Sequence, residues 1–285
     1  MLVVYRSFSV GGYRYGFNGQ ERSDEIRGEG NSYTAQFWEY EPKIGRRWNL
    51  DPRPKIGESS YFTFSGNPIL LADPRGDTVI VNSFGAIISN DDIGTAVYVH
   101  HYTDNTNRFI GNLGGTIDAN EIMGNLLDKN VKDMRSMMKI PGYGPYMYYR
   151  RVKNRGEWDY KSNKRYIYAL ANRFDRGNES PTRFKYDEYL LTAAEFGNFH
   201  FGVLGLATQF FSKPTLLEMA GRAQMQAGTS DPSWQKYKVV EHIAGNDRYY
   251  EKVLQAPYGD DPEDQRSIYK GFQLYMRKYR DSENY

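Results

Sequence analysis

The chain has 285 residues, of which 39% are hydrophobic and 15% aromatic, and its formal net charge is +2. This composition suffices for a core in one large or two ordinary domains and argues against wholesale disorder. The chain has no cysteine, which excludes disulfides, thiolate metal sites and cysteine nucleophiles. No apolar run reaches the ~20 residues of a transmembrane segment, and the N-terminus lacks the basic start of a classical signal peptide.

The charge is distributed unevenly along the chain. Residues 131–190 contain 14 Lys and Arg against 7 Asp and Glu, a net of +7, whereas residues 1–130 have a net of −4 and residues 191–285 a net of −1. The middle segment is therefore the candidate surface for an anionic partner, with a solvated basic face as the simpler alternative.

Residues 11–72 read as short strands separated by glycine-rich turns, and Asn18-Gly19 suits a two-residue hairpin turn. Several segments resemble, in order, the RHS repeat-associated core of the Bacteroidota type: YRYGFNGQE at 13–21, GEGNSY at 28–33, YEPKIGRRW at 40–48, NPI at 67–69 and DPRG at 73–76. The resemblance implies that residues 1–76 are the remnant of a core that closes a β-shell around a C-terminal toxin. The chain would then be the tip of such a protein.

Asp73, Pro74 and Gly76 mark a change of composition. Many RHS proteins cleave their own chain near such an Asp-Pro-x-Gly motif. The resemblance of this chain to them therefore implies a cleavage boundary at these residues. An ordinary turn is the alternative. The functional residues are expected after this boundary.

Residues 77–144 are expected to form a β-strand region plus a helix, either as a linker or as an extension of the toxin. Strands are predicted at 77–88, 95–101 and 109–117. Apolar residues at helical spacing predict a helix over 120–139, which ends before Pro141.

Residues 145–285 are expected to be mainly helical. Helices are predicted at about 186–196, 199–212, 215–227 and 262–280. Asp261 suits the N-cap of the last helix and Pro262 its first position. Together the elements predict an α+β fold: a short β-rich N-terminal segment, a small β region and a mainly α-helical C-terminal domain.

Four motifs follow one another in this last part of the chain: GEWDYK at 156–161, EFGNFHFG at 195–202, AGRAQ at 220–224 and PYGDDPEDQ at 257–265. In this order they resemble the polymorphic toxin type 44 domain, over roughly residues 145–280. The resemblance implies a secreted antibacterial effector with nuclease activity. It would be made in the cytoplasm and delivered without a classical signal peptide. It also implies a cognate immunity protein and, within a longer effector, an RHS shell or secretion apparatus as partners.

His200 is the candidate general acid and base. Its aromatic and small neighbours predict a partly buried pocket, and histidine supplies a pKa near neutrality. The alternative is a core histidine whose ring is satisfied by a backbone carbonyl.

Asp260, Asp264 and Glu195 are the candidate catalytic carboxylates. Capping explains Asp261 but not Asp260, and three aspartates at 260, 261 and 264 are also candidate ligands for a divalent metal, although no cofactor is expected. Gln224 lies among small residues on a predicted helix. It is expected either to bond across a close backbone contact or to orient the substrate.

Trp158, Asp159, Lys161, Asn198 and Gln265 are the candidate substrate-binding residues. Lys161 and neighbouring basic residues would bind phosphates, and Trp158 would stack on bases. A core tryptophan with solvated lysines is the alternative. For Asn198, an N-cap of the helix expected after it is the favoured interpretation.

These motifs leave three functions open. The first is a metal-independent RNase in which the RNA 2′-hydroxyl is the nucleophile, His200 is the acid and base, and Lys161 or a neighbouring arginine stabilises the phosphate. The second is a cell-envelope hydrolase acting on peptidoglycan through Glu195 or the Asp260 cluster. The third is a non-enzymatic toxin cassette.

Overall fold

The computed structural model describes residues 14–16, 20–35, 38–50, 59, 61, 78–90, 95–244 and 247–280. They belong to two compact units, residues 1–117 and 118–285. Asn18-Gly19 and the expected cleavage boundary at Asp73, Pro74 and Gly76 lie outside the described residues. The elements mix helices and strands, which confirms the α+β fold class.

The first unit begins with a small antiparallel sheet. Its strands are β1 (Glu21–Arg22), β2 (Tyr33–Ala35), β3 (Trp38–Glu41) and β4 (Arg46–Arg47), in that order, and the short helix α1 (Asp24–Arg27) connects the first two. The Arg27 guanidinium lies 3.6 Å from the centre of the Trp48 ring and 3.2 Å from a Glu41 oxygen. These contacts join the helix to the sheet.

A second group of strands in this unit has the order β6-β5-β7-β8-β9. The strands are β5 (Thr78–Val81), β6 (Ile87–Asn90), β7 (Ala96–His101), β8 (Thr106–Asn112) and β9 (Thr116–Asp118). The strand predicted at 95–101 is confirmed. The segments 77–88 and 109–117 each contain a turn, because Gly85 and Gly114 adopt the positive φ of 74° and 72° that reverses the chain.

The second unit contains the helices α2 (Asn120–Met138), α3 (Tyr143–Val152), α4 (Ile167–Phe174), α5 (Ala193–Ala207), α6 (Lys213–Gln226) and α7 (Pro262–Leu274). A π-helical turn, η4 (Tyr275–Tyr279), continues α7, and η3 (Pro232–Trp234) is a single 3₁₀ turn. The strands β10 (Arg183–Tyr186) and β11 (Tyr189–Leu191) form an antiparallel hairpin. The helices predicted over 120–139, 215–227 and 262–280 agree closely with α2, α6 and α7 with η4.

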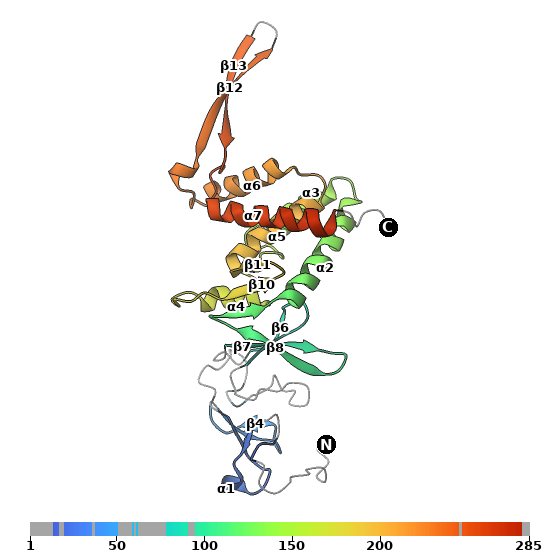
Figure 1. Ribbon diagram of the computed structural model, residues 1–285, viewed down its shortest axis with the longest axis vertical. Helices are drawn as coiled ribbons and strands as arrows, with labels where there is room; N and C mark the ends of the chain where they lie inside the picture. The colour runs from blue at the N-terminus through green and yellow to red at the C-terminus, as the bar shows by residue number, and fades with distance from the viewer. Residues whose placement is uncertain are drawn as a thin grey trace. The chain divides into compact units, whose positions relative to one another are not determined.

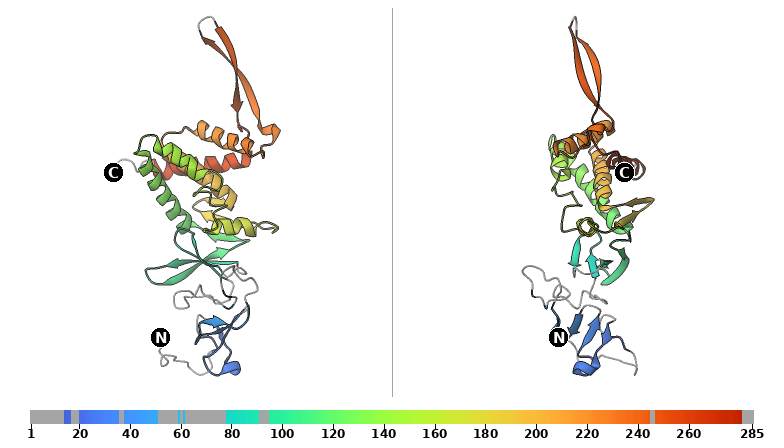
Figure 2. Two further views of the ribbon diagram at one scale, coloured as in Figure 1. Left: turned by 180° about the vertical axis from the view of Figure 1, so that it is seen from behind. Right: turned by 90° about the vertical axis from the view of Figure 1, so that its left-hand side faces the viewer.

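Helix α5 is the centre of the second unit. It packs along α7 and also contacts α2, α3, α4 and α6 (Figures 1 and 2). Two glycines permit the close crossing of α5 and α7: a Cβ on Gly202 would lie 2.4 Å from the Ile268 carbonyl oxygen, and one on Gly271 would lie 2.1 Å from that of Phe199. The core of the unit therefore depends on backbone-to-backbone contact at this crossing.

Two predicted helices are wrong. Residues 186–196 and 199–212 were expected as separate helices, but one helix spans Ala193–Ala207. Thr192 and Glu195 form a capping box that starts it, and the preceding residues form the β10–β11 hairpin. Asn198 lies inside this helix, so its expected role as an N-cap is wrong as well. Helices α3 and α4 and strands β10 to β13 were not predicted.

A long hairpin extends away from the helices of the second unit (Figures 1 and 2). It consists of β12 (Lys236–Ala244) and β13 (Asp247–Gln255), paired in antiparallel register. Its exposed apolar side chains include Tyr237, Val239, Ile243 and Tyr250. The two strands therefore stabilise mainly each other.

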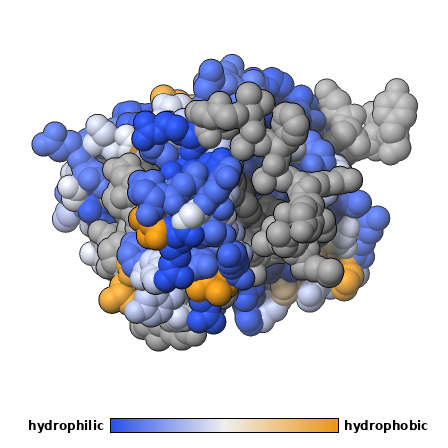
Figure 3. Space-filling view, turned by 90° about the horizontal axis from the view of Figure 1, so that it is seen from below, coloured by the Kyte–Doolittle hydropathy of each residue, from blue (hydrophilic) through white to orange (hydrophobic). Residues whose placement is uncertain are grey.

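The surface seen in Figure 3 is predominantly hydrophilic, and the hydrophobic residues on that face lie in separate places. In the described part of the chain, no helix combines the length and the apolar character that crossing a membrane requires.

Candidate functional site

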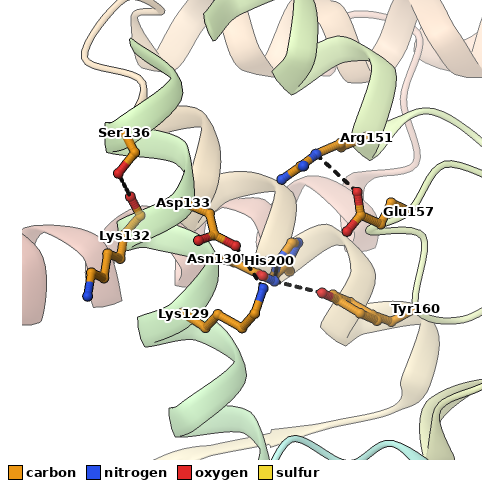
Figure 4. Close-up of polar contacts among 9 residues, drawn as sticks. All are labelled: Lys129, Asn130, Lys132, Asp133, Ser136, Arg151, Glu157, Tyr160 and His200. Carbon is orange, nitrogen blue, oxygen red and sulfur yellow. Dashed lines mark hydrogen bonds and ion pairs between the residues drawn. The ribbon is translucent and has the colours of Figure 1, made fainter. Parts of the chain in front are cut away.

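His200 lies in the interior of the second unit. The side-chain nitrogen Nδ2 of Asn130, on α2, lies 3.0 Å from His200 Nε2 and 2.7 Å from the Tyr160 hydroxyl (Figure 4). The rings of Trp158, Tyr160 and Phe196 surround the imidazole at centroid distances of 5.8, 5.1 and 5.9 Å. The histidine is 1% exposed. It is therefore enclosed by aromatic rings and held by one amide.

Burial lowers the pKa of His200 from 6.5 to about 3, because transfer out of water disfavours the charged imidazolium. The ring is therefore neutral at neutral pH. The expected pKa near neutrality is wrong for this arrangement. The alternative of a core histidine fits, although the partner that the structure shows is a side-chain amide.

The GEWDYK segment forms a turn between α3 and α4. Trp158 and Tyr160 are buried against His200, so Trp158 has no free face for stacking on a base. Asp159 is also buried, and its Oδ2 accepts the backbone N–H of Arg155 at 2.9 Å. Lys161, the last residue of the motif, is exposed. The predicted substrate-binding role therefore remains open for Lys161 alone among these four residues.

Asp260 and Asp264 interact at the N-terminus of α7. Burial, and next the negative charge of Asp264, raises the pKa of Asp260 to about 7. Asp260 is buried, and its Oδ2 has no hydrogen-bond partner among the described residues. Burial and the charge of Asp261 raise the pKa of Asp264, while Lys161 and a hydrogen bond with Asn198 lower it. The half-buried Asp264 thus interacts electrostatically with the buried Asp260 and with the exposed Lys161.

Local sequence explains how α7 presents these carboxylates. Asp261 is the N-cap, since its Oδ1 accepts the Glu263 N–H at 2.8 Å, and Pro262 lies in the first turn, as predicted. Asp264 follows in the same turn, where the helix dipole favours a negative charge. Asp260 precedes the cap and has no capping role.

Gln224 and Gln265 hold the loop before α7 in place. Gln224 Oε1 accepts the Asp261 N–H at 3.0 Å, and Gln265 Nε2 donates to the Pro257 carbonyl at 2.8 Å. The close backbone contact expected near Gln224 is confirmed, because a Cβ on Gly221 would lie 2.0 Å from the Tyr258 carbonyl oxygen. Both glutamines therefore make structural contacts.

Glu195 and Asn198 lie in the first two turns of α5. Glu195 Oε2 accepts the Thr192 N–H at 2.8 Å and lies 3.5 Å from Arg183, so its carboxylate serves the capping box. Asn198 is half-buried and bonds to Asp264. The site that the structure assembles consists of Asp260, Asp264, Asn198 and Lys161, from three separate segments.

Residues 147–277 match the family model described as bacterial toxin 44. The match indicates a bacterial polymorphic-toxin domain in this part of the chain, and it spans all four motifs and the assembled site. No curated protein and no solved structure matches the chain. The resemblance of residues 11–77 to an RHS core stays a prediction.

Three carboxylates near the start of α7 were the predicted ligands for a divalent metal. Within the described ranges, no three His, Asp or Glu side chains are grouped in a way that would hold a metal ion. The predicted ligands Asp260, Asp261 and Asp264 therefore do not form such a group in the described residues, and Asp261 Oδ1 is engaged as the N-cap of α7.

One residue beside the toxin 44 domain was missed. Asn130 lies on α2, before the matched residues and in the segment predicted as a linker or extension, yet it is buried and holds His200 and Tyr160. Its sequence signal is a polar side chain next to Val131 within the apolar stripe of the helix. The helix before the matched residues therefore contributes to the interior of the toxin unit.

Proposed function

We propose that the toxin 44 domain is an RNase whose acid–base chemistry is carried by Asp260 and Asp264. The observation that supports this is the carboxylate pair itself, with a buried Asp260 whose pKa is about 7 beside a half-buried Asp264. A carboxyl group that holds its proton up to about pH 7, next to a second carboxylate, supplies an acid and a base at the same time.

In this proposal Asp264 contacts the substrate, because it is the more exposed carboxylate and lies beside Lys161. The pair accepts the proton of the RNA 2′-hydroxyl, whose oxygen attacks the adjacent phosphorus. The bond from phosphorus to the 5′-oxygen breaks, and that oxygen takes up a proton from the carboxyl groups. The products are a 2′,3′-cyclic phosphate and a free 5′-hydroxyl. Lys161 offsets the charge that develops on the phosphoryl oxygens.

His200 has a positioning role in this proposal. It is buried and neutral, and with Asn130 it holds Tyr160, the residue that directly precedes Lys161. The aromatic cage therefore fixes the turn that presents the lysine to Asp264. Proton transfer is assigned to the carboxylates.

The proposal is tested with the purified chain and single-stranded RNA in the presence of EDTA. We expect cleavage that leaves 2′,3′-cyclic phosphate ends, that EDTA does not abolish, and that is lost in Asp264→Asn. Intact RNA at high protein concentration would overturn the proposal. Full activity of folded Asp264→Asn, with activity lost in folded His200→Gln, would return the acid–base role to His200.

The same carboxylates favour a second candidate, a hydrolase of the cell-envelope glycan, because glycoside hydrolysis also uses a pair of carboxylates. Expression with and without an export signal separates the two candidates. Toxicity confined to the exported form, with cellular RNA intact, would select the envelope hydrolase. The basic charge of residues 131–190 favours the RNase.

We further propose that the chain is the tip of an RHS-type effector that is delivered into competing bacteria and neutralised by a cognate immunity protein. The toxin 44 match and the resemblance of residues 11–77 to an RHS core support this setting. Co-expression with a small neighbouring gene product that relieves toxicity is the expected result. Persistent toxicity with every neighbouring product would count against an immunity partner.

A further inference from the structure

Helix α3 exposes a row of tyrosines. Tyr143, Tyr146 and Tyr149 recur every third residue and are 41%, 54% and 57% exposed. Residues three apart are neighbours on a helix surface, so these rings lie on one broad side of α3. The Arg150 guanidinium lies over the Tyr146 ring, 5.7 Å from its centre, so Tyr143 and Tyr149 offer the freer aromatic surfaces.

A basic pocket of about 360 Å³ adjoins this row, where the chain turns after α3. The side chains that line it include Tyr146, Arg150, Arg151, Lys153, Arg155 and Glu157. Four of these side chains are cationic and one is a carboxylate. The pocket therefore joins an exposed tyrosine to a concentration of positive charge.

The single carboxylate does not neutralise the pocket. Glu157 pairs with Arg151 at 3.1 Å, as Figure 4 shows, and Arg150 donates to the Tyr146 hydroxyl at 2.9 Å. The side chains of Lys153 and Arg155 pair with no carboxylate in the ranges that the structure describes, although the backbone N–H of Arg155 donates to Asp159. The helix dipole accounts for cations at Arg150 and Arg151, in the last turn of α3, but not for the two that follow.

The backbone of Arg155 adds a second observation. This residue has a φ of 59°, a left-handed conformation that glycine adopts without strain and arginine does not. The turn holds this conformation, because the Arg155 N–H donates to Asp159 Oδ2 at 2.9 Å and the Gly156 N–H donates to the Lys153 carbonyl at 2.7 Å. The turn thereby places the exposed Arg155 side chain at the pocket.

We propose that the α3 tyrosines together with Arg150, Lys153 and Arg155 form a binding site for single-stranded nucleic acid. The cations would bind backbone phosphates and the exposed rings would stack on bases. That the bound strand is also the substrate rests on the proposed RNase function. The new element is the surface on which the strand is held. The chain runs from Arg155 directly to Lys161, which connects this surface to the carboxylate pair.

The pairing of cations with free aromatic faces distinguishes this ligand from other anions. A duplex hides the faces of its bases within the stack, and an anionic membrane has no bases. In this proposal bases stack on the α3 tyrosines and not on Trp158, whose ring is buried.

The test uses the full chain and a fluorescein-labelled single-stranded 2′-O-methyl oligoribonucleotide, which has no free 2′-hydroxyl and stays intact. Fluorescence anisotropy gives Kd at several salt concentrations. Lys153→Gln and Arg155→Gly are each expected to weaken binding about 10-fold and to lower the slope of log Kd against log salt by about one. Since glycine suits the backbone at position 155, this variant keeps the fold while removing the charge.

Tyr149→Ala is expected to weaken binding roughly 5- to 100-fold, and Tyr149→Phe to retain it, because the phenyl ring still stacks. Matched controls are Tyr250→Ala and Lys252→Gln, which remove an exposed tyrosine and lysine from β13 and should leave Kd unchanged. Wild-type affinity in both Lys153→Gln and Tyr149→Ala would overturn the inference. Equal affinity for duplex RNA or for phosphatidylserine vesicles would also overturn it.

The readout separates this inference from the proposed RNase function. If the Lys153, Arg155 and Tyr149 variants weaken binding but unmodified RNA is never cleaved, the RNase proposal fails and the binding site stands. If RNA is cleaved while all of these variants bind normally, the binding site fails and the RNase proposal stands.

Discussion

The pKa values of two buried residues in the second unit, residues 118–285, shift in opposite directions for the same physical reason. Burial disfavours the charged form of each, so the pKa of Asp260 rises to about 7 and that of His200 falls to about 3. Their effects on stability partly cancel between about pH 4 and pH 6.5. Single substitutions are therefore needed to observe either one.

Asp260→Asn is expected to stabilise the fold at pH 7, by on the order of 3 kcal/mol, and to lower activity by about 100-fold or more. The folded state holds a proton that the unfolded state releases above the ordinary pKa of 3.8. Wild-type stability should therefore fall, relative to the variant, as pH rises from about 4 to about 7, and level off beyond. Thermal unfolding of both proteins from pH 4 to pH 8 measures this difference, and a difference that does not vary with pH would contradict it.

His200→Gln is expected to lower stability at pH 7 by about 1–3 kcal/mol, because the amide replaces the ring contacts of the cage imperfectly. The unfolded wild type gains a proton below pH 6.5 that the folded state does not bind until about pH 3. The wild-type advantage should therefore be present above pH 6.5 and disappear as pH falls towards 3. Urea unfolding across this window tests the prediction. An advantage that persists at pH 4 would show that His200 is not the titrating group.

At the scale of elements, the crossing of α5 and α7 controls the stability of the toxin unit. Gly271→Ala is expected to destabilise by about 2–3 kcal/mol, since its Cβ would lie 2.1 Å from the Phe199 carbonyl oxygen. Gly197→Ala in α5 is the matched control, because its Cβ would only reach Lys161 at 3.9 Å. The control should gain about 0.5–1 kcal/mol from helix propensity alone. Denaturant midpoints give both values, and equal effects of the two substitutions would refute close packing at the crossing.

The β12–β13 hairpin is expected to contribute little to the stability of the helices. Its strands contact chiefly each other, and an isolated two-stranded ribbon adds little free energy. Deleting residues 239–252 and joining the paired positions 238 and 253 by a short turn should therefore shift Tm by less than ~3 °C. A larger fall would mean that the hairpin supports the helical core.

At the scale of the whole molecule, toxicity is expected to depend on the part of the chain after the first 76 residues. The matched toxin domain and the assembled site both lie beyond that point. Residues 77–285 expressed alone should therefore be as toxic as the full chain, and Asp264→Asn should abolish the toxicity of both. Growth after induction measures this. A harmless fragment that is nevertheless folded by circular dichroism would assign a required role to residues 1–76.

Several features of the fold could be predicted because their causes are local. The α2 stripe, the Asp261-Pro262 start of α7 and the turn-rich N-terminal segment depend on spacing and capping within a few residues. The single helix over Ala193–Ala207 was missed because Gly197 suggests a break. Helix α5 continues through it, stabilised by packing against five other helices.

The sequence by itself determined the α+β class, the toxin 44 motifs and the set of residues from which a site is built. Only the tertiary structure decided which of those residues belong together. Contacts between distant segments exclude water from His200, Trp158 and Asp159, and they bring Asp264 to Lys161 and Asn198. Burial and charge proximity depend on the whole fold, so the same four motifs contribute core residues at some positions and, at another, two carboxyl groups whose pKa values are raised.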